Sequence, residues 1–179
     1  DEDEKALREI KKLIEDNERL NREVNERIER LIDRARRLME RVNREIERLI
    51  KEVRERLGEE DKRAREILRR LKEELKKHKK ESDDLLEKLK RRLDEHRKDS
   101  KRSKDDLKRE LDRVAAKRLR GEELEKTLRD IRKRSKEDAD KVKKSLEEVE
   151  EEIRRIEKRL RESLKKVEDD IERIRREAT

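Results

Sequence analysis

Three side chains in the second half of the chain have the types used in hydrolytic catalysis. His96 and Ser100 lie four residues apart, so they share one face of a helix, and Asp138 follows further along the chain. Together these types can activate a hydroxyl as a nucleophile. The reaction also needs hydrogen-bond donors for the developing oxyanion, and the sequence places no glycine-rich turn beside them. We therefore expect no catalytic residues and no enzyme activity.

The two histidines, His78 and His96, are the remaining candidates for chemistry, as metal ligands. On one helix they would be about 27 Å apart at 1.5 Å per residue, too far to share an ion. The chain has no Cys, and the expected neighbours are Asn and Ser. We expect two buried core histidines and neither a metal nor a cofactor. Acid should then destabilise the fold, because protonation favours the chain in which the rings are exposed.

The segments that must position these residues are separated by two glycines, and the chain contains no proline. Gly58 and Gly121 divide the chain into three nearly equal parts, and a glycine just past a helix end commonly caps it in the left-handed conformation. Asp61 can cap the second helix, whereas no Ser, Thr, Asp or Asn precedes the third. We expect three helices, over residues about 3–57, 60–119 and 122–177.

An apolar stripe runs along each segment. At 100° per residue the apolar positions, such as Ile10, Leu71 and Ile153, fall within about 140° of arc. A strict seven-residue repeat would drift by about 20° per heptad, so a stripe that stays in place indicates nearly straight helices. One continuous charged rod would need no stripe. The sequence therefore predicts one domain over residues 1–179, an all-α, single-chain, antiparallel (up-down-up) three-helix bundle.

Polar residues occur inside the stripe, and many of them are separated by five whole helical turns. The repeated pairs are Asn25 and Asn43, His78 and His96, Ser82 and Ser100, and Ser145 and Ser163. In an up-down-up bundle these positions face one another to within about one turn. We expect two copies of one polar layer, formed by Asn43, His78, Ser82 and Ser163 and by Asn25, His96, Ser100 and Ser145.

A second set of polar residues does not follow the repeat and is expected to extend the second layer. Its members are Asn17, Asn21, Ser103, Ser135 and Asp138. A buried polar group without a partner costs about 1–3 kcal/mol. A wrong helix register would strand several such groups at once, so we interpret the whole set as a structural polar network that specifies register.

Composition and charge bound the remaining possibilities. The chain is 64% charged and 27% hydrophobic with no aromatic residue, so any core is narrow and aliphatic. The net charge of +8 comes from an excess of basic residues in the middle segment, including the run KKHKKES at 76–82. Acidic residues are interleaved and no aromatic side chain can stack on bases. We expect no specific nucleic-acid partner, no membrane association and no targeting signal, which leaves the localisation of a soluble chain open.

The repeated Asn/His/Ser layers, their five-turn spacing, the missing aromatics and Cys and the Glu/Lys/Arg surface resemble de novo designed helical bundles with buried hydrogen-bond networks. The resemblance covers the whole chain and identifies a class. It implies a synthetic scaffold without natural biochemical activity, a monomer that needs no partner, and a parent for split helices that associate. The alternative is a helical module whose basic middle helix binds nucleic acid or acidic partners weakly. Two features depart from the pattern of such designs. The turns have few capping residues, and Asp138 is an unusual residue for a neutral hydrogen-bond network.

Overall fold

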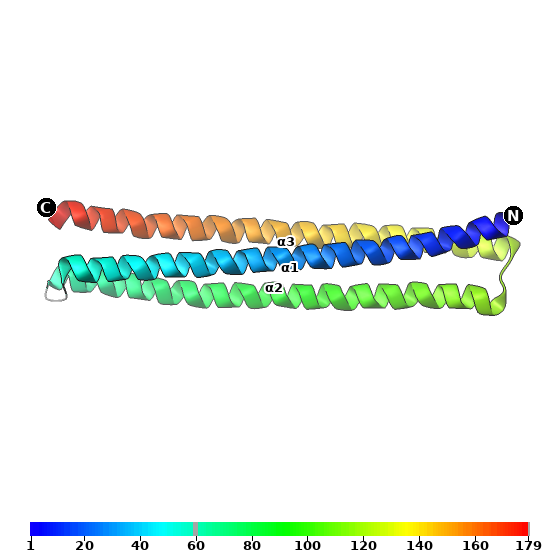
Figure 1. Ribbon diagram of the computed structural model, residues 1–179, viewed down its shortest axis with the longest axis horizontal. Helices are drawn as coiled ribbons and strands as arrows, with labels where there is room; N and C mark the ends of the chain where they lie inside the picture. The colour runs from blue at the N-terminus through cyan, green and yellow to red at the C-terminus, as the bar shows by residue number, and fades with distance from the viewer. Residues whose placement is uncertain (59–60, 179) are drawn as a thin grey trace. The chain divides into compact units, whose positions relative to one another are not determined.

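Three long α-helices make up the protein. The computed structural model describes residues 1–58 and 61–178, apart from the side chains of residues 174, 177 and 178. The helices are α1 (Glu2–Leu57), α2 (Lys62–Lys117) and α3 (Gly121–Ala178), as drawn in Figure 1. No strand occurs within the described residues. The all-α, three-helix fold predicted from the sequence is confirmed.

Contacts within the chain group the helices into two compact units. Unit 1 consists of Asp1–Arg30 and Arg91–Val149, and unit 2 consists of Leu31–Lys90 and Glu150–Thr179. Each unit therefore contains a part of all three helices.

Contacts inside unit 1 establish how its helices run. Asn21 bonds to Ser100 and Asn25 bonds to His96, so numbers rise along α1 as they fall along α2. Glu9 pairs with Arg132 on α3. Because Asn17 and Asn21, further along α1, bond to Asp138, further along α3, α1 and α3 are parallel. The arrangement is up-down-up.

In unit 2, segments of the same three helices are joined by ion pairs. Glu47 of α1 pairs with Lys79 of α2 at 2.9 Å. On α3, Glu157 pairs with Arg34 of α1 and Glu152 pairs with Lys88 of α2. Contact of α1 with both other helices excludes the continuous-rod alternative.

The turn after α1 is formed as the sequence predicted. Gly58 has φ +70° and its N–H donates to the carbonyl of Arg54, the bond of a left-handed helix cap. Asp61 begins α2, because its Oδ1 accepts from the N–H of Arg63 at 3.0 Å. Helix α2 starts at Lys62 for this reason, and the predicted start at residue 60 lies outside the described residues.

The turn after α2 differs from the expectation, because the left-handed cap is Arg118 and not a glycine. Arg118 has φ +47°, and the N–H groups of Arg118 and Leu119 donate to the carbonyls of Ala115 and Val114. These two bonds form a Schellman motif, and the packing of Leu119 against the cluster that contains Val114 completes it. Helix α2 therefore ends at Lys117, before the predicted residue 119.

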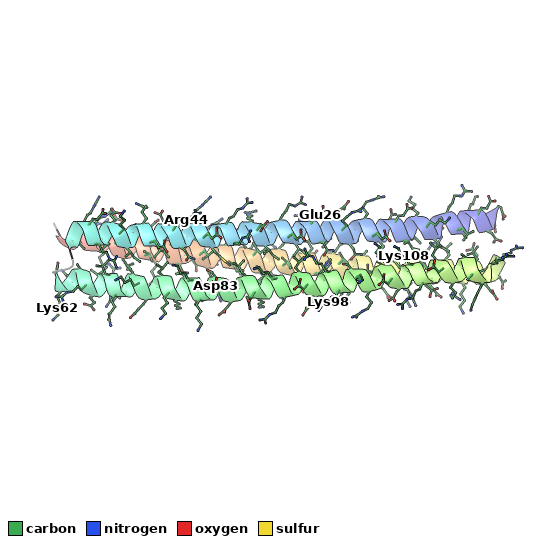
Figure 2. The ribbon with its side chains drawn as sticks, turned by 60° about the horizontal axis from the view of Figure 1, so that its bottom comes forward. Glu26, Arg44, Lys62, Asp83, Lys98 and Lys108 are labelled. Carbon is green, nitrogen blue, oxygen red and sulfur yellow. The ribbon has the colours of Figure 1, made fainter. Side chains whose placement is uncertain are left out.

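The core is aliphatic and the surface is charged. Ile10, Ile28 and Ile46 of α1 are at most 1% exposed. No large hydrophobic side chain is exposed among the described residues. Figure 2 labels six charged residues, from Glu26 of α1 to Lys108 of α2, all of which are exposed. No described helix combines the length and apolar character needed to cross a membrane.

Candidate functional site

A buried polar cluster in unit 1 brings together four of the residues singled out in the sequence. Asn17 Nδ2 donates to Asp138 Oδ2 at 2.6 Å, and Asn21 Nδ2 donates to the same oxygen at 3.0 Å. Ser100 Oγ donates to Asn21 Oδ1 at 2.8 Å. Asn17 and Asn21 are 4% and 5% exposed. The cluster therefore joins all three helices through hydrogen bonds inside the bundle.

The asparagines are placed for this cluster by the helix itself. Asn17 and Asn21 are one turn apart on α1, so both face the core. Asn21 Nδ2 also lies 2.9 Å from the backbone oxygen and 3.2 Å from Oδ1 of Asn17. Each amide is thus held by its neighbour as well as by Asp138, which fixes the orientation of both side chains.

Asn25 and His96 form a second contact in the same unit. His96 Nδ1 lies 2.5 Å from Asn25 Oδ1. An amide oxygen only accepts hydrogen bonds, so Nδ1 carries the proton and Nε2 is left as the acceptor. Nε2 is buried without a hydrogen-bond partner within the described structure. His96 is therefore held as a neutral ring by one bond.

The charge state of His96 follows from this position. Burial lowers the pKa of His96 below its ordinary value of 6.5, and the carboxylates of Asp99 and Asp138 oppose the shift without cancelling it. Protonation would place a new N–H at the unpartnered Nε2. The site consequently favours neutral imidazole.

The other predicted members of the region are less connected. Ser103, Ser135 and Ser145 are half-buried, and among the described contacts none of them has a hydrogen bond to the cluster. Ser135 Oγ is buried without a partner. Thr127, also inside the stripe, donates to the carbonyl of Glu123 and accepts from Arg113. The bonded region is therefore narrower than the predicted one.

In unit 2, the corresponding layer has a different geometry. His78 and Ser82 are each 5% exposed, while Asn43 and Ser163 are half-buried. Within the described structure no hydrogen bond joins these four residues. Asn43 Oδ1 and His78 Nε2 are buried without hydrogen-bond partners, and Glu74 Oε1 lies 3.5 Å from His78 Nε2.

The same residue types therefore give different contacts in the two layers. The residue one turn before the histidine also differs, being Glu74 before His78 and Arg92 before His96.

The three residues with catalytic side-chain types, His96, Ser100 and Asp138, each bond to asparagines of α1. Ser100 Oγ donates to Asn21, and the ring of His96 bonds to Asn25, so the hydroxyl and the imidazole have separate partners. Asp138 accepts from the two asparagines. Within residues 1–58 and 61–178, no three His, Cys, Asp or Glu side chains are grouped to hold a metal ion.

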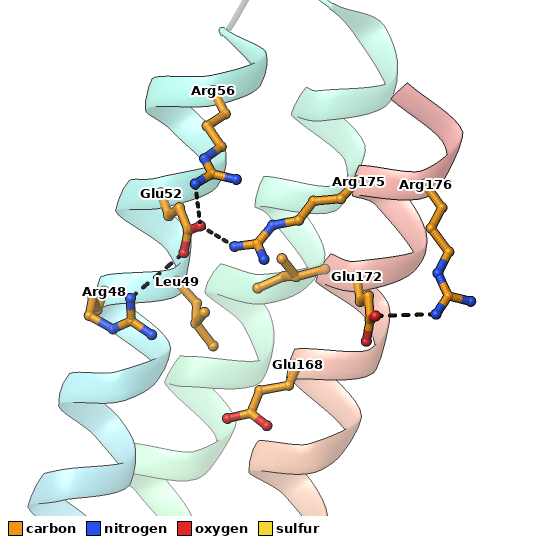
Figure 3. A pocket seen from close by; sticks show the side chains of 9 residues that line it. Arg48, Leu49, Glu52, Arg56, Glu168, Glu172, Arg175 and Arg176 are labelled. Atoms are coloured by element: carbon orange, nitrogen blue, oxygen red, sulfur yellow. Dashed lines mark hydrogen bonds and ion pairs between the residues drawn. The ribbon is translucent and has the colours of Figure 1, made fainter. Parts of the chain in front are cut away.

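Surface grooves in both units are lined by charged side chains. One of them has a volume of about 620 Å³ and lies between α1 and α3 in unit 2 (Figure 3). At its centre Glu52 pairs with Arg48, Arg56 and Arg175. Glu45 accepts hydrogen bonds from the guanidinium of Arg48, and this contact lowers the pKa of Glu45 and raises the pKa of Arg48. The groove is therefore lined by side chains that already bind one another.

One functional contact of the fold has no local signal in the sequence. The N–H of Gly121, at the start of α3, donates to Asp3 Oδ1 at 3.1 Å. The cap that the sequence near residue 121 lacks is supplied by the first turn of α1, 118 residues away. Only a three-dimensional arrangement of the helices could reveal it.

Comparison with known proteins found no matching family model, no matching curated protein and no matching solved structure.

Proposed function

We propose that the chain is a synthetic structural scaffold, in which buried hydrogen bonds specify how three helices pair and no natural biochemical activity is present. The observation that carries this proposal is the cluster of Asn17, Asn21, Ser100 and Asp138, whose donors and acceptors bond to one another across three helices. A ligand site would direct such groups towards an opening. Here Asn17, Asn21 and Ser100 bond inside the protein, and Asp138, which also borders a surface groove, accepts two of these bonds.

Designed origin is supported by the five-turn repetition of the layers and by a composition without aromatic residues or Cys. In this proposal the protein is a monomer that needs no partner or cofactor. Its uses are to hold a defined helical framework, or to act as the parent of separate helices that associate in the same register.

A binding titration tests the proposal against the alternative of a basic binding module. A labelled DNA duplex is titrated with the chain at physiological salt, alongside a variant with Lys76→Glu, Lys77→Glu and Lys80→Glu. We expect weak binding that disappears as salt rises, because phosphate contacts exchange with counterions. Tight binding at physiological salt that the variant loses would replace the scaffold proposal by the alternative.

The enzyme alternative is tested separately with ester and amide substrates. We expect no turnover above that of buffer, for the chain and for His96→Ala alike. Turnover that His96→Ala abolishes would contradict the proposal.

A further inference from the structure

The five-turn repeat extends far beyond the polar layers. In α1, Ile10, Ile28 and Ile46 are successive copies, and all three are buried. The same holds for Leu71, Leu89 and Leu107 of α2 and for Leu124, Val142 and Leu160 of α3. Since one repeat completes five whole turns, each step along a helix presents the same kind of side chain in the same direction. Every helix therefore carries a nearly periodic core face.

A periodic face permits a wrong pairing. If α1 of one chain pairs with α2 and α3 of a second copy after sliding by one repeat, Ile28 occupies the place of Ile10 or Ile46. Within one closed bundle this slide would leave the helix ends uncovered. In an open series of copies, each uncovered end is covered by the next copy, so the loss is avoided.

The repeated polar layer does not reject this pairing. After the slide, Asn25 meets His78 where it met His96, and Asn21 meets Ser82 where it met Ser100. Both exchanges replace a residue by one of the same type. A layer that repeats with the core cannot distinguish two registers that differ by the repeat.

The five nonrepeated polar residues can make this distinction. Their counterparts one repeat away in unit 2 are all apolar: Ala35 for Asn17, Met39 for Asn21, Leu85 for Ser103, Ile153 for Ser135 and Ile156 for Asp138. Four of these counterparts, all except Leu85, are at most 3% exposed. The slide would move the amides of Asn17 and Asn21 from Asp138 to Ile156, and it would leave the carboxylate of Asp138 without both donors.

We infer that Asn17, Asn21 and Asp138, with Ser103 and Ser135, prevent staggered assembly of this chain with further copies of itself. The inference rests on the proposed scaffold function. It assigns the register specificity to these five residues and not to the repeated layer. It concerns the partner that the periodic core would otherwise accept, a second copy of this chain displaced by five turns.

A repeat variant of the full chain tests the inference. It carries Asn17→Ala, Asn21→Met, Ser103→Leu, Ser135→Ile and Asp138→Ile, which gives unit 1 the side chains found at the equivalent positions of the other unit. A smaller variant with only the changes at Asn17, Asn21 and Asp138 serves if the first does not regain its helical circular dichroism. Each protein is unfolded in guanidinium, refolded at several concentrations and measured by light scattering after size exclusion.

The matched control increases the apolar content elsewhere. The layer variant carries Asn43→Leu, His78→Leu, Ser82→Ala and Ser163→Ala, so it loses one repeated layer and keeps all five nonrepeated residues. We expect the unmodified chain and the layer variant to return as single chains. The repeat variant should give a series of oligomers whose mean mass rises by roughly twofold or more with concentration, as open assemblies do.

Three results would overturn the inference. The first is a repeat variant, or its smaller form, that refolds as a single chain. The second is a layer variant that assembles to the same extent as the repeat variant. The third is an unmodified chain that already forms the oligomer series. The first two results leave the scaffold proposal in place, whereas oligomers of the unmodified chain would also contradict its monomeric state. The duplex titration and the turnover assay test the scaffold proposal separately, so the two failures are distinguishable.

Discussion

Unit 1 and unit 2 contain the same helical repeat, but several positions that are polar in unit 1 are apolar in unit 2. Asn17 and Asn21 bond to Asp138 in unit 1, where unit 2 has Ala35, Met39 and Ile156. The residues are buried in unit 2 and buried or half-buried in unit 1. Since the apolar version also forms a helical core, helix formation and burial do not require the polar one. In the function proposed here, the polar residues select among possible helix pairings.

Identical residue types can also differ between the units. Asn25 accepts a hydrogen bond from His96 in unit 1, while Asn43 Oδ1 and His78 Nε2 have no hydrogen-bond partners in the described part of unit 2. A buried hydrogen bond therefore depends on the exact placement of both helices as well as on the residues.

The first prediction places an acid in unit 2 at the position equivalent to Asp138. Ile156→Asp buries a carboxylate with no amide donors, because Ala35 and Met39 stand where unit 1 has asparagines. We expect a loss of about 3–5 kcal/mol in the free energy of unfolding, measured in guanidinium, as for a buried charge without a partner. Adding Ala35→Asn and Met39→Asn should recover part of it. No recovery would mean that the cluster cannot be transferred between the units.

The second prediction removes the acid from unit 1. Asp138→Ile leaves the amides of Asn17 and Asn21 without their carboxylate acceptor, for an expected loss of about 1–3 kcal/mol. Asn17→Ala and Asn21→Met remove the stranded donors, so the triple variant, measured at a dilution where it is a single chain, should be more stable than Asp138→Ile alone. Equal stability of the two variants in urea would show that the amides do not depend on Asp138.

The third prediction concerns acid. Because burial lowers the pKa of His96, the unfolded chain binds a proton first as pH falls below 6.5. The contribution of His96 to stability is therefore present above pH 6.5, is lost as pH falls towards the lowered pKa, and is constant below it. The urea midpoint of the unmodified chain should fall more than that of His96→Gln across this window. Parallel curves would contradict the prediction, since both proteins share the same carboxylates.

The fourth prediction compares the two turns. Arg118 in unit 1 and Gly58 in unit 2 both have positive φ, which disfavours a side chain by about 1–2 kcal/mol. Arg118→Gly should raise the free energy of unfolding by about 1 kcal/mol, after allowance for the greater freedom of glycine in the unfolded chain. Gly58→Arg should lower it by a similar amount. An unchanged thermal midpoint in Arg118→Gly would contradict the prediction, because the backbone bonds of the Schellman motif are available to both residues.

Periodicity made the helices and their order predictable. The apolar stripe identified three helices, and the punctuation by Gly58 and Gly121 placed both turns within a few residues. The contact between Asn25 and His96 could also be predicted, because the five-turn spacing aligns positions on two antiparallel helices. These features depend on angles around a helix, which a sequence determines directly.

Contacts at single side chains were less accessible. The left-handed cap at Arg118 could not be predicted from the preference of such caps for glycine. It is stabilised by Leu119 and by the carbonyls of Ala115 and Val114. Ser103 and Ser135 are half-buried, yet among the described contacts neither bonds to the cluster. Residue spacing places a side chain on a face, and interhelical distance decides whether it forms a bond.

The capping of α3 by Asp3 gives the protein two contrasting spectroscopic probes. The chain has only two glycines, and their amides report on different levels of structure. The Gly58 N–H bonds within its own helix end, to Arg54, whereas the Gly121 N–H bonds across the chain to α1. Selective ¹⁵N-glycine labelling therefore yields one signal for local helix fraying and another for the docking of α1 against α3. Their relative exchange with deuterium would time these two events in a single sample.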